Sequence, residues 1–150
     1  MVVGRRRVVL AVAGAVLVVG AVLAVGRAGD DGPAGSAEPE DAVHALFAAR
    51  GDGSCVAYAA TTTEFFREDL YLGAATCEDF AAEAAEYATL RPVRVRVESV
   101  ARIDVDTAQV EVVETYREGT PEEYRLGMAY RVTLTDDGWR VDHRDLTVLR

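Results

Sequence analysis

The chain begins with a long apolar run. Residues Val8–Gly26 include no charged or strongly polar side chain. As a helix rising 1.5 Å per residue they would span roughly 28 Å, close to the hydrocarbon thickness of a bilayer. Arginines Arg5–Arg7 precede the run and Asp30–Asp31 follow it, which indicates an N-terminus inside and the remainder outside. The length of the run favours an uncleaved signal-anchor that comprises residues 1–26. The alternative is a signal peptide that is cleaved to leave a secreted protein.

A linker and one domain are expected after this run. Residues 27–37 are rich in Gly, Ala and Asp and lack apolar periodicity, which predicts a linker. In the domain, residues 38–150, a first helix begins near Pro39. Val43, Leu46 and Phe47 share one face of it, and the helix ends at Gly51–Gly53.

Two further helices are predicted from capping residues. Thr61 and Glu64 fit a capping box that opens a short helix. Thr76 caps the next helix, which Pro92 ends. The first half of the domain therefore contains three predicted helices.

The second half alternates apolar and polar residues with the period of a β-strand. Four such stretches follow one another, and Asp137-Gly138 before the last is the strongest hairpin signal in the chain. The inward positions are Val93, Val95, Val97, Val110, Val112, Tyr124, Leu126, Met128, Tyr130, Val132, Leu134, Trp139 and Val141. The pattern predicts an α+β domain of three helices packed on a four-stranded antiparallel sheet.

The charge of the chain restricts its partners. The net charge is -9, but residues 1–28 contain four arginines and no acid, so the remainder has 12 arginines against 25 acidic residues. A domain this acidic repels phosphate backbones, and we expect no nucleic-acid partner. All 16 basic residues are arginine, and asparagine is absent, which indicates a bacterial genome of high G+C content.

The order of elements and the last hairpin resemble a known family. Helices followed by a four-strand meander, with Asp-Gly-Trp-Arg-Val in the hairpin Leu134–Val141, are similar to the nuclear transport factor 2-like superfamily. The likeness covers Pro39 to Leu146 and is greatest to short, membrane-anchored or secreted members from high-G+C Gram-positive bacteria. It implies a curved sheet wrapped around a long helix into a cone. In enzymes of the superfamily, the cavity holds Asp, His or Tyr residues that act as general acid or base.

The two cysteines predict a covalent link. Cys55 and Cys77 are the only cysteines, and both follow the export segment, where oxidising surroundings favour a structural disulfide. The bridge would join the segment after the first helix to the first turn of the third. A redox-active pair is the alternative, but such pairs normally use a close Cys-x-x-Cys spacing.

Two sets of residues are candidates for a site inside the cone. Strict alternation places His143 and Asp145 on the same face as Trp139, where they would form a general acid–base pair. Tyr87, Tyr130 and Trp139 are candidates for the wall of an apolar pocket. The competing interpretations are a frayed strand end for the pair and plain core packing for the rings. The sequence has no metal-ligand spacing or phosphate-binding glycine loop, so we expect no metal and no cofactor.

These observations predict a non-catalytic binding or accessory module of the bacterial cell envelope, anchored by one transmembrane helix. Its expected partners are the membrane and other cell-envelope proteins. One alternative is a carrier of a small apolar ligand. Another is a cavity enzyme of the isomerase or dehydratase kind that uses His143 and Asp145. Both alternatives need an enclosed cavity of roughly 300 Å³ or more.

Overall fold

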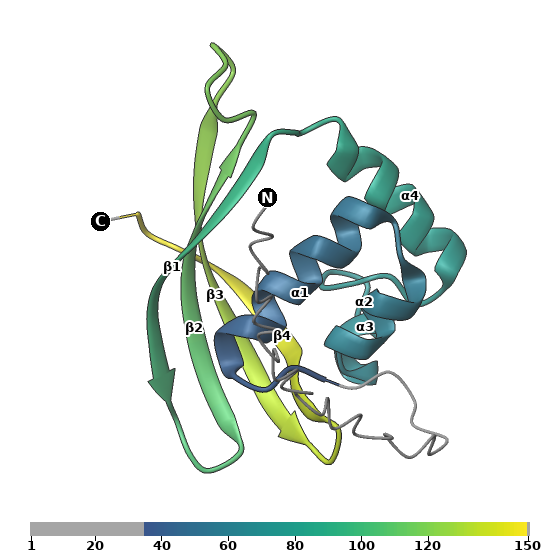
Figure 1. Ribbon diagram of the computed structural model, residues 1–150, viewed down its shortest axis with the longest axis vertical. Helices are drawn as coiled ribbons and strands as arrows, with labels where there is room; N and C mark the ends of the chain where they lie inside the picture. Colours follow the sequence, from purple (N-terminus) through teal and green to yellow (C-terminus); the bar gives the residue numbers. More distant parts are fainter. Residues whose placement is uncertain (1–34, 150) are drawn as a thin grey trace, which may run out of the picture.

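A curved antiparallel sheet has all of its described helices on one face (Figure 1). The computed structural model describes residues 35–149. The strands are β1 (Val93–Arg102), β2 (Thr107–Tyr116), β3 (Tyr124–Thr135) and β4 (Gly138–Thr147), and they lie side by side in chain order. The predicted α+β class and four-strand meander are confirmed.

Within residues 35–149 the structure has four helices, so the prediction of three is wrong. They are α1 (Pro39–Asp52), α2 (Cys55–Thr61), α3 (Glu64–Glu68) and α4 (Cys77–Ala88). The unpredicted helix is α2, which is seven residues long and rich in alanine. In such a short, alanine-rich segment the apolar and polar positions do not show the 3.6-residue period that indicates a helix.

The helix caps explain where α3 and α4 begin. The hydroxyl of Thr76 accepts a hydrogen bond from the backbone N–H of Asp79 at 3.1 Å, which confirms the predicted cap of α4. The cap of α3 is Thr63 rather than Thr61. Thr61 ends α2, and its hydroxyl donates to the carbonyl of Tyr58 at 3.2 Å.

The core lies between α1 and the concave face of the sheet. Val43, Leu46 and Phe47 on α1 are buried as predicted. The largest fully buried side chains of the sheet and the other helices are Tyr58, Phe66, Phe80, Val110, Val112, Tyr130, Val132 and Val141. Figure 1 shows α1 running along this face, with α4 on its outer side.

A disulfide joins α2 to α4. Cys55 and Cys77 are bonded, with Cα atoms 5.5 Å apart, which confirms the predicted bridge. The predicted anchor, Val8–Gly26, lies outside the described residues. Among residues 35–149 the helices are too short or too polar to cross a bilayer.

The described chain starts against the last hairpin. The N–H of Gly35 donates to the carbonyl of Asp137 at 2.7 Å, and Ser36 forms a bridge with Trp139. Gly138 in this hairpin has a φ of 118°, a conformation that favours glycine, so the Asp-Gly hairpin signal has a direct structural cause.

Candidate functional site

A buried carboxylate, Glu114, lies on the concave face of the sheet. The preceding inward positions of β2 are apolar (Val110 and Val112), but Glu114 continues their alternation and is only 2% exposed. Its Oε1 accepts a hydrogen bond from the hydroxyl of Tyr130 at 2.6 Å, and its Oε2 accepts one from Tyr116. Both oxygens of Glu114 therefore act as hydrogen-bond acceptors.

The two tyrosines remain protonated donors. Burial raises the pKa of Tyr130, and the nearby charge of Glu114 raises it further. Burial and the same carboxylate also raise the pKa of Tyr116. Because each hydroxyl keeps its proton, Glu114 has two neutral hydrogen-bond donors around it.

A guanidinium from α1 completes the charged interior. Arg50 is 5% exposed, and its Nε donates to Glu83 on α4 at 2.7 Å. Burial opposes the charge on Arg50, but Tyr130, Glu83 and Glu114 outweigh it and raise the pKa of the guanidinium. Arg50 therefore stays charged, and its direct ion-pair partner is Glu83 rather than Glu114.

An open pocket of about 610 Å³ reaches Glu114. One wall is the loop after α3, and the others are the ends of β2, β3 and β4. The lining residues are Asp69, Tyr71, Leu72, Glu114, Tyr116, Leu126, Met128, His143, Arg144, Asp145 and Leu146. Arg144 contributes a guanidinium whose Nη2 donates to the carbonyl of Tyr71 at 3.5 Å.

Large apolar side chains surround the mouth of this pocket. Tyr71 is 89% exposed and Leu146 is 74% exposed, and both line the pocket. Leu126 is also exposed, on the neighbouring strand. A cluster of exposed apolar side chains on a protein surface is typical of a contact site for a ligand or a partner.

The structure does not place His143 and Asp145 with Trp139. Val141 pairs with Val132, but His143 pairs with Arg131, so Asp142 is an extra residue that forms a β-bulge. The bulge reverses the alternation beyond it. Arg144 now lies opposite the buried Tyr130, and His143 pairs with Arg131. His143 and Asp145 do contact each other, with Nε2 and Oδ2 3.2 Å apart. The bulge therefore breaks the strict alternation that was expected to place them beside Trp139, although both residues line the β4 edge of the pocket over Glu114.

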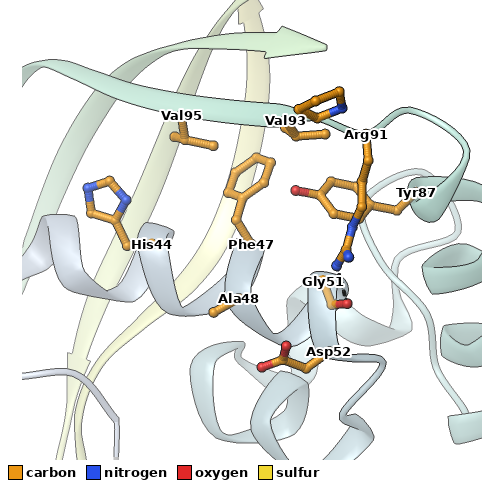
Figure 2. Close-up of a pocket in the computed structure, with 10 residues that line it drawn as sticks. His44, Phe47, Ala48, Gly51, Asp52, Tyr87, Arg91, Val93 and Val95 are labelled. Carbon is orange, nitrogen blue, oxygen red and sulfur yellow. Dashed lines mark hydrogen bonds between the residues drawn. The ribbon is translucent and has the colours of Figure 1, made fainter. Parts of the chain in front are cut away.

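The three predicted pocket rings do not share a cavity. Tyr87 lines a second pocket, about 480 Å³, between α1 and β1. Figure 2 shows its hydroxyl and the Phe47 ring facing the same space, and Arg91 reaching towards Gly51. Tyr130 is completely buried beside Glu114. Trp139 is buried at the far end of the sheet, where the guanidinium of Arg102 lies 4.7 Å from its ring centre.

Sequence reasoning missed Glu114, although a signal for it exists. In the alternation Val110, Val112, Glu114, Tyr116 the glutamate occupies an inward position. A charged residue at such a position is costly unless it is hydrogen-bonded, so it marks a polar site inside an apolar layer. Among the described residues no group of three or more His, Cys, Asp or Glu side chains is arranged to hold a metal ion.

Solved structures of other proteins share the fold of this chain. Family models and curated proteins contain no match. A SEC-C motif containing protein from Rhodopseudomonas palustris is 16% identical, with a TM-score of 0.56 over 73% of this chain and 79% of that one. A domain of unknown function with a cystatin-like fold from Nostoc punctiforme is 22% identical, with a TM-score of 0.52 over 75% and 78%. Identities this low show the fold alone.

A member of the superfamily that the hairpin resembles is also a structural neighbour. It is an NTF-2 like protein of unknown function from Shewanella oneidensis, 14% identical, with a TM-score of 0.48 over 74% of this chain and all of that one. At this score we draw no functional argument from the likeness.

Proposed function

We propose that this chain is a non-catalytic, ligand-binding accessory module at the outer face of a bacterial cytoplasmic membrane. Its binding site is the pocket over Glu114. The observation that carries the proposal is a buried, hydrogen-bonded carboxylate in an open and largely apolar pocket of about 610 Å³. Small-molecule sites commonly combine apolar walls with a few convergent polar groups in a space of roughly 300–1,000 Å³.

Binding is a better account of this geometry than proton transfer. Both oxygens of Glu114 already accept hydrogen bonds from tyrosine hydroxyls. The pair expected to transfer protons, His143 and Asp145, lines the β4 edge of the pocket beyond the bulge and has no hydrogen bond to Glu114 among the described residues. The pocket therefore presents a fixed carboxylate and a guanidinium, Arg144, to whatever enters it.

The membrane location is supported by the sequence and by the disulfide. The apolar run Val8–Gly26 follows three arginines, and a Cys55–Cys77 bridge fits an oxidising compartment. N-terminal sequencing of the mature protein, with protease added to intact spheroplasts, tests this part. We expect an intact N-terminus and digestion of the domain from outside. A mature N-terminus beyond residue 26, or a domain that protease reaches only after lysis, would contradict it.

A methyl signal in the pocket tests the binding function. The chain has two methionines, Met1 and Met128, and Met128 lines the pocket. With ¹³C-methyl methionine in the full-length chain in nanodiscs, we expect compounds from a metabolite library to shift the Met128 signal. Leu146→Trp should block these shifts, and the matched control Val105→Trp, in the exposed turn after β1, should not. Failure of every compound to move Met128 would refute the site.

A further inference from the structure

The charges that line the pocket over Glu114 are unequal. Three carboxylates line it, those of Glu114, Asp69 and Asp145, against the single guanidinium of Arg144. Asp145 contacts His143, with Oδ2 and Nε2 3.2 Å apart, and Asp69 accepts a hydrogen bond from the N–H of Tyr71 at 2.8 Å. The pocket is thus a region of negative potential, which attracts cations and disfavours anions.

Glu114 has no direct counter-ion among the described residues. Its hydrogen-bond partners, Tyr116 and Tyr130, are neutral hydroxyls. Arg50 interacts with Glu114 electrostatically, but its direct ion pair is with Glu83. A buried carboxylate is stabilised most by a directly paired cation, because its water shell has been lost. A carboxylate oxygen can accept more than one hydrogen bond, and each oxygen of Glu114 accepts one from a tyrosine. Glu114 can therefore accept a further hydrogen bond from a ligand.

The surroundings of Glu114 suit the apolar part of a ligand. Leu126 pairs with Glu114 on the adjacent strand, and Met128 lies one inward position further along. On the other side, Tyr116 and Tyr124 stack with ring centres 5.1 Å apart. Aromatic rings near a carboxylate also favour a cation electrostatically.

We infer that the pocket over Glu114 binds an organic cation, a small ammonium compound with an apolar body, whose charged group pairs with Glu114. The inference rests on the proposed binding function and names the ligand class of that same site. The ammonium group takes the place of the missing counter-ion, and the body lies against Leu126, Met128 and Leu146. Arg144 lies on the β4 wall and repels the charged end, which directs it towards Glu114.

Three probes of similar size and different charge test the ligand class. We would titrate 2-phenylethylamine, 2-phenylethanol and 3-phenylpropionate into the full-length chain in phosphatidylcholine nanodiscs and follow the Met128 methyl signal. The amine should bind about tenfold more tightly than the alcohol or better, as expected for a charge-assisted hydrogen bond in a desolvated site. The anion should bind most weakly. Equal affinity for the amine and the alcohol would overturn the inference and leave the binding function standing. Absence of any Met128 shift, across these probes and the library, would refute both.

Variants locate the charge that matters. Glu114→Gln preserves the shape and an acceptor for the tyrosines, and should weaken the amine about tenfold or more while leaving the alcohol unchanged. Glu111→Gln, on the same strand but on the exposed face, is the matched control and should change nothing. Arg144→Gln removes a repelling charge, so amine binding should stay equal or become tighter. Weaker amine binding in Arg144→Gln, or unchanged binding in Glu114→Gln, would contradict the inference. If Glu114→Gln does not fold, Glu114→Asp and Arg144→Gln still decide the question.

Discussion

The hydroxyl of Tyr130 offers a direct test of the buried polar cluster. Tyr130→Phe removes the 2.6 Å hydrogen bond to Glu114 and keeps the ring, which packs edge-on against Phe47 with centres 6.2 Å apart. The loss leaves one oxygen of a buried carboxylate without its donor. A hydrogen bond to a charged group contributes about 1.5–3 kcal/mol, and we expect the free energy of unfolding to fall by that amount.

Tyr116→Phe is the matched control for this change. It removes the other hydrogen bond to Glu114, but Tyr116 lines the open pocket, so water can replace its hydroxyl. We expect a smaller loss, about 0.5–1.5 kcal/mol. The comparison separates the cost of an unsatisfied buried carboxylate from that of losing a tyrosine hydroxyl in general.

Urea unfolding of the full-length chain in detergent micelles measures both losses. Trp139 is the only tryptophan and is buried, so its fluorescence reports unfolding of the domain. With a slope of about 1.5 kcal/mol/M, Tyr130→Phe should lower the midpoint by about 1–2 M without changing the slope. A loss below about 0.5 kcal/mol for Tyr130→Phe, or a larger loss for Tyr116→Phe, would refute the reasoning.

Three further outcomes are expected from the same structure. Replacing Cys55 and Cys77 by serine should lower stability by about 3 kcal/mol in the same urea assay, because the bridge closes a loop with a sequence separation of 22. Gly138→Ala should cost about 1–3 kcal/mol, because Gly138 has a φ of 118° and an added Cβ would lie 2.7 Å from the carbonyl oxygen of Ser36. Burial raises the pKa of Tyr58, Tyr87, Tyr116 and Tyr130. Stability should therefore be full below about pH 10 and fall as pH rises, because only the unfolded chain ionises there. Phenolate absorbance of the folded chain should lag behind that of the unfolded chain. An unchanged urea midpoint in the double serine variant or in Gly138→Ala would contradict the corresponding prediction. Full phenolate absorbance before the chain unfolds would contradict the prediction on pH.

Local signals in the sequence predicted much of the fold. Pro39 at the start of α1, the Thr76 cap of α4 and the Asp137-Gly138 hairpin each act through backbone geometry within a few residues. Period-two alternation likewise placed β1 to β4 in order. Helix α2 was missed because a seven-residue, alanine-rich helix leaves little pattern, and its stability comes from the disulfide and from burial of Tyr58.

The site was harder to predict because its geometry depends on pairing between strands. A bulge inserts one residue, here Asp142, without any marker in the local sequence, and it reverses every later position of β4. That reversal removed His143 from the alternation of Trp139 and Val141 and placed Arg144 opposite Tyr130. Glu114 carried a usable signal as an inward charge, but its partners Tyr116 and Tyr130 are brought to it only by the folded sheet.

Intermolecular NOEs from a bound amine test the central claim most directly, since the described residues form other pockets that a ligand could occupy. With 2-phenylethylamine and the methyl-labelled full-length chain, the account predicts NOEs from the ligand to the methyl groups of Met128 and Leu146. It also predicts their loss in Glu114→Gln and their retention in Glu111→Gln. NOEs to Val93 and Val95, in the pocket of Figure 2, or NOEs that persist unchanged in Glu114→Gln, would contradict it.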